Sequence, residues 1–141
     1  MKRFCLILPL LLLLGGCNAT APASLEQAEA QALRTVGADY RLADADFIAT
    51  NFPDMPPLKQ AKVYLAANGD GREFGFFELS EERQAPQAIA SLRAYLANEE
   101  QAVRALAALY PAEELQMRLA RFARVKIEQN GCLIGYDLTK S

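Results

Sequence analysis

Three aspartates provide the most concentrated carboxylate chemistry in the sequence. Asp44, Asp46 and Asp54 lie in or beside a stretch that contains three prolines within residues 53–57. Carboxylates can bind a cation through oxygen or act as a general acid and base, which would suit a hydrolase. Acidic residues in such loops also cap helices and remain in solvent. Nothing in the sequence brings these three together, so an acidic site over residues 44–54 and simple capping both stand at this point.

Other catalytic and metal chemistry is restricted by the composition. The sequence contains no histidine, which excludes Ser-His-Asp and Cys-His catalysis and removes the commonest transition-metal ligand. Residues 68–71, Asn-Gly-Asp-Gly, look like part of an EF-hand loop. Aligning them with that loop places Ala66 and Phe77 where calcium needs carboxylates. We therefore expect no metal and no cofactor.

The third cysteine, Cys132, is a candidate nucleophile. It lies in a predicted hairpin at a position on the apolar face, where burial raises the pKa of a thiol and makes it inert. Without histidine, a reactive thiol would also need another base. We expect Cys132 to be a core residue.

The first predicted hairpin has two registers, depending on the length of its loop. If residues 68–71 form the loop, Leu65 lies opposite Phe74 and Val63 lies opposite Phe76. That register gives one continuous apolar face, whereas a two-residue turn would place apolar residues opposite charged ones. The four-residue loop is the prediction.

This register leaves a second group of apolar side chains on the other face of the hairpin. Tyr64, Phe77 and Leu79 would share that face. If exposed, they would form a binding face for a partner or ligand. The alternative is that residues 38–60 fold over them and bury them.

Capping residues and helical periodicity predict the elements around the hairpin. Ser24 begins a helix that ends at Gly37, and Asp44 begins a short turn of helix. Apolar residues then recur at helical spacing from Ile89 to Tyr110, and Pro111 starts a second helix.

A second hairpin closes the predicted fold. An Asn130-Gly131 type I′ turn would place Ile127 opposite Ile134 and Val125 opposite Tyr136. The order is then helix, hairpin, helices, hairpin. We predict a two-layer α+β domain whose two antiparallel hairpins form a four-stranded sheet, covered by helices on one face.

The start of the chain has the pattern of an export signal. Lys2 and Arg3 precede an apolar run over residues 4–14, which is too short to cross a bilayer because a spanning helix needs about 20 residues. The run ends at Leu14-Gly15-Gly16-Cys17, which resembles the bacterial lipobox. The resemblance implies that residues 1–16 are removed and that Cys17 becomes a diacylglyceryl cysteine at the new N-terminus.

The remaining chain would be a tethered domain. Residues 17–23 are expected to be the lipidated N-terminus and a short tether, and residues 24–141 a single domain. Residues 1–16 contain two basic residues and no acid, so their removal takes the net charge from −2 to −4. This charge argues against nucleic acid and against electrostatic docking on anionic lipid. The partner membrane would therefore be held through the lipid, since two acyl chains anchor stably.

The domain also resembles a known group of proteins. The residues that suggest this are the Leu92-Arg93 helix, Tyr110-Pro111 and the Asn130-Gly131 hairpin, within residues 25–138. Together they resemble a family of short lipoproteins of clostridial Gram-positive bacteria that carry a domain of unknown function. The resemblance implies a lipid anchor on the extracytoplasmic face of the cell membrane, and it transfers no catalytic residue. The alternative location is a Gram-negative outer membrane.

The sequence therefore predicts where the protein works more than what it does. We expect a non-catalytic binding or assembly module at the membrane surface, with an envelope protein or a small ligand as its partner. The alternatives are a small-ligand-binding lipoprotein and an envelope hydrolase that uses the acidic loop 44–54.

Overall fold

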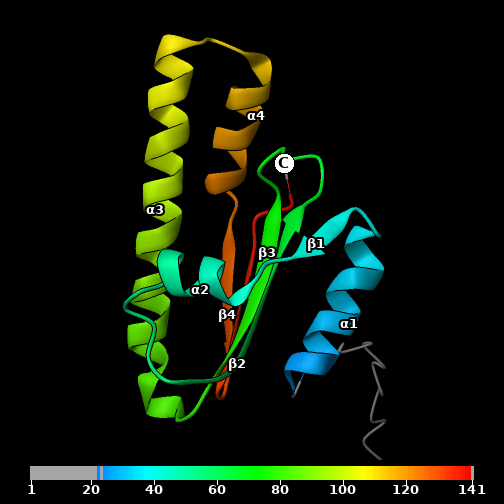
Figure 1. Cartoon of the computed structure of the whole chain (residues 1–141), viewed down its shortest axis with the longest axis vertical. Helices are drawn as coiled ribbons and strands as arrows, with labels where there is room; N and C mark the ends of the chain where they lie inside the picture. The colour runs from blue at the N-terminus through cyan, green and yellow to red at the C-terminus, as the bar shows by residue number, and fades with distance from the viewer. Residues whose placement is uncertain (1–21, 23, 141) are drawn as a thin grey trace, which may run out of the picture.

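The computed structural model describes residue 22 and residues 24–140 of the chain (Figure 1). The predicted signal at residues 1–16, and Cys17 with most of the tether, lie outside the described residues. The helices are α1 (Leu25–Val36), α2 (Ala45–Asn51), the short 3-10 helix η1 (Glu82–Gln84), α3 (Ala85–Leu109) and α4 (Glu113–Phe122). The strands are β1 (Tyr40–Leu42), β2 (Leu58–Ala66), β3 (Glu73–Leu79), β4 (Lys126–Asn130) and β5 (Leu133–Asp137).

Local sequence sets the ends of the first two helices, as predicted. The Ser24 hydroxyl accepts a hydrogen bond from the Gln27 N–H at 3.3 Å, and Gly37 ends α1 with a φ of 85°. The Asp44 carboxylate accepts a hydrogen bond from the Phe47 N–H at 2.8 Å at the start of α2. These acceptors satisfy N–H groups that have no partner inside the first turn of a helix.

The sheet is antiparallel, but it has one strand more than predicted. Its strand order is β1-β2-β3-β5-β4, so the two hairpins join through β3 and β5. The prediction of four strands is wrong because the chain after Gly37 is extended and pairs with β2, with Tyr40 opposite Ala66. The α+β class and the two hairpins are confirmed.

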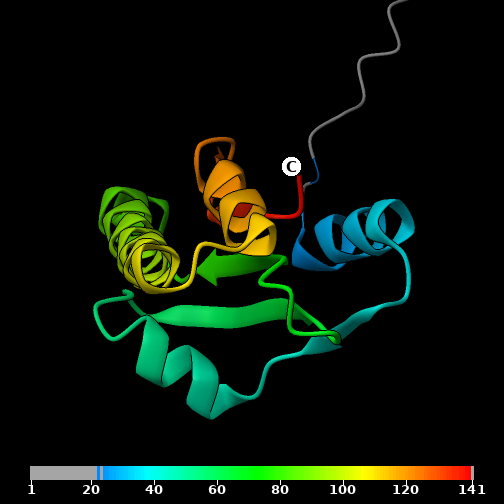
Figure 2. The ribbon, with the colours of Figure 1, turned by 90° about the horizontal axis from the view of Figure 1, so that it is seen from above.

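Helices cover both faces of the sheet rather than one. Figure 2 shows α1 and α3 on opposite sides of it. On the α3 side, the core includes Phe77, Leu92 and Ile134, all at 0% exposure. On the α1 side, Leu25 and Ala28 pack with Leu133 and Phe76. The prediction of one covered face is wrong because both faces of β3 carry large apolar side chains, and each needs a cover.

The register of the first hairpin differs from the prediction by one residue. Tyr64 lies opposite Phe74, and Val63 lies opposite Gly75. A shift of one residue exchanges the two faces of the strand relative to its partner. Gly75 suits this register because a Cβ there would lie 2.6 Å from the Tyr136 ring. The tyrosine therefore packs directly over the glycine backbone.

The second hairpin turns one residue later than predicted. Gly131 and Cys132 form the turn, and Asn130 lies opposite Leu133. Ile127 consequently faces Tyr136 instead of Ile134. The partner of each β4 residue is therefore displaced by two positions along β5. Because side chains alternate between faces with a period of two, the apolar residues keep the predicted face. Gly131 supplies the positive φ, at 58°.

The far half of α3 packs with α4 as a helical hairpin at the upper end of Figure 1. Four large apolar side chains are exposed there, at Leu106, Leu109, Tyr110 and Met117. Within residues 22 and 24–140, no helix is both long and apolar enough to span a bilayer.

Candidate functional site

The three aspartates of the predicted acidic site have separate positions. Asp44 is the N-cap of α2, and Asp46 lies exposed in the first turn of that helix. Asp54 is exposed in the following loop, where its backbone carbonyl accepts a hydrogen bond from Gln87 at 3.2 Å. Among the described residues, no group of three or more acidic or cysteine side chains could hold a metal ion. The structure therefore assigns Asp44 to capping and gathers no cation site from these residues.

The predicted binding face of Tyr64, Phe77 and Leu79 is corrected by the structure. Phe77 and Leu79 are 0% exposed, and the Phe77 ring contacts Phe52 with centroids 5.0 Å apart. Phe52 follows α2, so the segment over residues 38–60 does cover these residues. Tyr64 points to the other face, where it stacks on Phe74 and its hydroxyl donates to Glu29. The one-residue change in register is the reason for this separation.

The two remaining candidates from the sequence are Cys132 and the Asn68–Gly71 turn. Cys132 is half-buried in the β4–β5 turn and packs against the α3-side core. In the other turn, the Asp70 carboxylate accepts hydrogen bonds from the Arg72 backbone at 2.9 Å and side chain at 2.7 Å. Partial burial acts to raise the pKa of Asp70, but the hydrogen bonds from Arg72 and Asn68 lower it overall. The turn is thus organised around an arginine.

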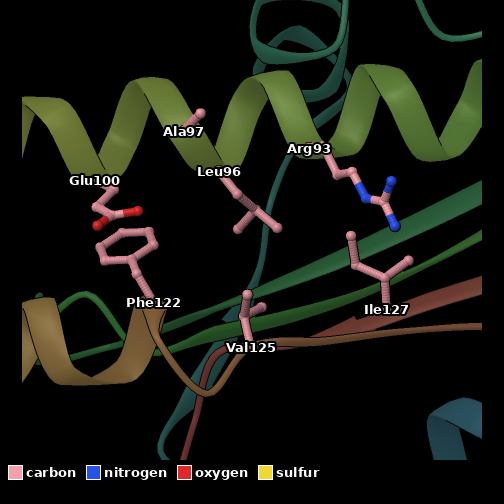
Figure 3. Close-up of a pocket in the computed structure, with 7 residues that line it drawn as sticks. All are labelled: Arg93, Leu96, Ala97, Glu100, Phe122, Val125 and Ile127. Carbon is pink, nitrogen blue, oxygen red and sulfur yellow. The ribbon is translucent and has the colours of Figure 1, made fainter.

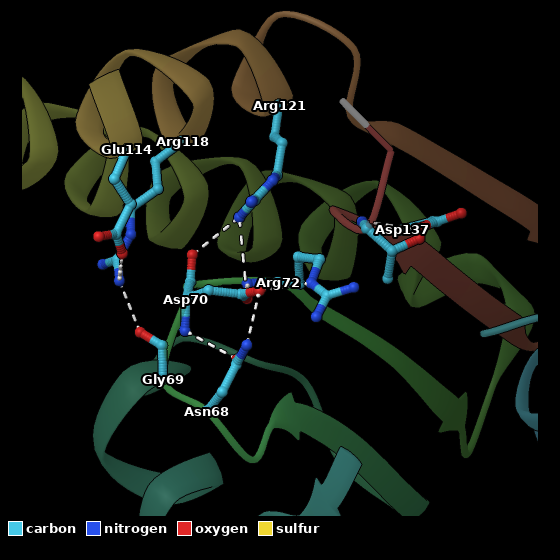
Figure 4. Close-up of polar contacts among 9 residues, drawn as sticks. Asn68, Gly69, Asp70, Arg72, Glu114, Arg118, Arg121 and Asp137 are labelled. Atoms are coloured by element: carbon cyan, nitrogen blue, oxygen red, sulfur yellow. Dashed lines mark hydrogen bonds and ion pairs between the residues drawn. The ribbon is translucent and has the colours of Figure 1, made fainter. Parts of the chain in front are cut away.

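Two arginines of α4 hold this turn from the other side (Figure 4). Arg118 donates to the Gly69 carbonyl at 2.6 Å, and Arg121 donates to the Asp70 carbonyl at 2.8 Å. Arg121 is only 7% exposed, and its guanidinium lies 3.9 Å from the Asp70 carboxylate. These contacts fasten the end of α4 to the β2–β3 turn.

We expect Arg121→Ala to lower the free energy of unfolding by about 2 kcal/mol, because it leaves the Asp70 carbonyl without its cationic donor and removes an ion-pair partner of the Asp70 carboxylate, which keeps its pair with Arg72. Urea unfolding of the purified protein measures this loss. The matched control is Arg124→Ala, since Arg124 is exposed and lies three residues farther along the chain, past the end of α4. Equal losses in the two variants would show that the buried contact adds nothing to stability.

A buried carboxyl group lies inside the α3-side core. Glu73 of β3 is 8% exposed and accepts hydrogen bonds from the Tyr95 and Tyr136 hydroxyls, each at 3.0 Å. Burial raises the pKa of Glu73 to about 7, although the two tyrosine hydrogen bonds act to lower it, and Glu99 raises it further. Desolvation of the charged form therefore outweighs the hydrogen bonds.

Sequence reasoning missed Glu73, although its position carried a signal. Every second side chain of a strand points to the same face. Glu73 is in the same series of alternate positions as Gly75, Phe77 and Leu79, so it must share their face of β3. Once Phe77 is placed in the core, Glu73 follows it there.

An open groove runs between α3 and the edge strand β4 (Figure 3). Its volume is about 310 Å³, and Leu96, Phe122, Val125 and Ile127 form its apolar lining. Arg93 and Glu100 stand at its two ends, both on α3. Glu100 pairs with Arg104. Arg93 has no hydrogen bond or ion pair to any of the described residues, so its charge is free to meet a ligand.

A second groove lies on the α1 side of the sheet. Its volume is about 280 Å³, and Phe74, Phe76 and Gly135 belong to its lining together with Ala28 and Ala32 of α1. Lys126, Glu128 and Lys140 also line it. Both grooves have an apolar lining with a few charged side chains, as in many ligand sites.

Comparisons with protein-family models, curated proteins and solved structures found no match to this chain. Membership of the clostridial lipoprotein family and the lipobox at Cys17 therefore remain predictions from the sequence. The groove between α3 and β4 is the candidate site, because its apolar lining lies beside the edge strand β4 and Arg93, a cation without a hydrogen bond or ion pair to the described residues, stands at one end.

Proposed function

We propose that this protein is a lipid-anchored module of the bacterial cell envelope that binds a partner protein at the membrane surface. The groove between α3 and β4 is the observation that carries the binding part of this proposal. It offers apolar contact area and a charged group, Arg93, that has no hydrogen bond or ion pair with the described residues, which is a usual composition of a recognition site. The anchoring part rests on the lipobox that ends at Cys17.

The position of the tether is compatible with this arrangement. The Asn130 side chain donates a hydrogen bond to the Pro22 carbonyl at 2.7 Å, so the chain enters the domain beside the β4–β5 turn. The α3–α4 tip lies at the other end of the long axis (Figure 1). With Cys17 only five residues before Pro22, the β4–β5 turn would face the membrane and the tip would point away from it.

Lipid anchoring is tested by Cys17→Ala, which we expect to release the protein from the membrane fraction or to stall it as an unprocessed precursor. The physical reason is the loss of the thiol that receives the diacylglyceryl group. Fractionation of cells followed by mass measurement of the mature N-terminus gives the readout. The control is Cys132→Ala, which keeps the anchor.

A processed Cys17→Ala protein that still fractionates with membranes would contradict the anchor. Membrane release of Cys132→Ala would contradict it as well, because attachment would then depend on a thiol in the β4–β5 turn and not on Cys17.

A further inference from the structure

We propose that the groove between α3 and β4 binds an extended peptide of a partner protein, which adds a strand to the free edge of β4 and places an acidic side chain on Arg93. The inference rests on the binding function proposed above and names the chemistry of its partner. Three features of the groove support it: an open strand edge, an apolar lining of matching periodicity, and a free cation at one end.

The edge of β4 is open to pairing. Among the described residues, β4 is the last strand of the sheet and pairs with β5 alone. Asn130 and Leu133 close the two-residue turn as a hydrogen-bonded pair, so alternation directs the N–H and C=O groups of Ile127 and Gln129 away from β5. These outward groups make no other backbone hydrogen bond within residues 22 and 24–140. An unpaired row of this kind is a template for an added strand.

Successive side chains along this edge point to opposite faces of the sheet. Val125 and Ile127 point into the groove toward α3, with Val125 beneath Leu96 and Ile127 beneath Arg93 (Figure 3). Lys126 and Glu128 line the other groove, on the α1 side. A strand added to β4 would place every second side chain in the apolar groove, because successive side chains alternate between faces. The groove therefore selects apolar residues at alternate positions of the peptide.

The charges at the ends of the groove set its polarity and its length. Arg93 and Glu100 are seven residues apart on α3, which is about 10 Å along a helix. That length fits about three residues of an extended strand. In the more stable antiparallel pairing, the peptide begins at the Arg93 end and runs toward Phe122. The matching sequence is an acidic residue followed, two positions later, by an apolar one.

Peptide titration of the isotope-labelled full-length protein in detergent tests the inference. The probe is the blocked peptide acetyl-Thr-Asp-Thr-Val-Thr-amide, and the readout is hydrogen exchange of the Ile127 and Gln129 amides. We expect the peptide to slow this exchange. The same peptide N-methylated at its valine should not, because it lacks the N–H that pairs with β4. Replacement of its aspartate by asparagine should weaken binding about tenfold.

The matching protein variant is Arg93→Gln, which should weaken binding of the aspartate peptide about tenfold and leave binding of the asparagine peptide unchanged. Arg34→Gln is the control, because Arg34 is exposed on α1, and this helix lies on the opposite side of the sheet from α3 (Figure 2).

Three results would overturn the inference. One is the absence of binding at millimolar peptide, and another is equal binding of the N-methylated peptide. The third is protection of the β4 edge that depends only on protein concentration, because a second copy would then be the occupant. Membrane release of Cys17→Ala is scored separately, so a failed titration beside a released Cys17→Ala protein rejects the peptide and leaves the anchor intact.

Discussion

Phe77→Ala should be the most destabilising single substitution among the three phenylalanines of β3, with a loss of about 4 kcal/mol in the free energy of unfolding. Phe77 is 0% exposed and packs between the rings of Phe52 and Tyr136, with centroids 5.0 and 6.3 Å away. Removal of the ring deletes its apolar contacts and leaves a cavity beneath α3. Urea unfolding followed by circular dichroism measures the loss.

The matched control is Phe76→Ala. Phe76 is the same residue type one position earlier, but it is only half-buried and lies on the α1 face. We expect a loss no more than about half that of Phe77→Ala, since part of the ring is already in solvent. A larger loss of unfolding free energy for Phe76→Ala than for Phe77→Ala would favour the register in which Phe74 and Phe76 form the core face. It would contradict the pairing of Val63 with Gly75.

Glu73 should make the protein less stable as the pH rises from about 4.5 to about 7. The ordinary pKa of 4.5 applies to the unfolded chain, and burial raises the pKa of Glu73 to about 7 in the folded protein. The folded state therefore binds the proton more tightly than the unfolded state does. Its contribution is fully present below pH 4.5, and it is lost as the pH rises through the folded pKa, for a total on the order of 3 kcal/mol.

Glu73→Gln should remove this part of the pH dependence. The amide oxygen accepts a hydrogen bond from one of the two tyrosine hydroxyls, the amide NH2 can donate to the oxygen of the other, and the group never acquires a charge. Urea unfolding at a series of pH values between 4 and 8 gives the comparison. At pH 8 the variant should be more stable than the unsubstituted protein, and near pH 4 the difference should be small.

The control for this series is Glu128→Gln, because Glu128 is an exposed carboxylate on a strand. It should leave the slope between pH 4.5 and 7 unchanged. If Glu73→Gln also leaves that slope unchanged, the carboxyl group is not protonated preferentially in the folded state. The polar contacts of Glu29 and Asp70 lower the pKa of these two carboxyl groups. Their contribution to the pH dependence of stability therefore appears at lower pH than the window used for Glu73.

The sequence by itself determined the local structure of this protein. Ser24 and Asp44 are helix caps because their side chains reach N–H groups within their own first turns. The break at Pro111, the α+β class and the two hairpins were also predictable. Each depends on residues close together in the chain, where propensity, capping and alternation act directly.

The candidate site depended on the tertiary structure. A one-residue difference in the β2–β3 register exchanged the faces of Phe76 and Phe77, and no local signal in the turn decided between the two registers. The register was decided by long-range packing, in particular by Gly75 lying beneath Tyr136. The same packing placed Glu73 between two tyrosines.

The groove was likewise invisible in the sequence. Arg93 resembles any exposed helix residue until α3 is placed beside the edge strand, and β4 becomes an edge only through the strand order. Periodicity shows which side of an element is buried, but it does not identify the neighbour that buries it. That neighbour is chosen by the best packing of all the faces together, which is a property of the complete domain.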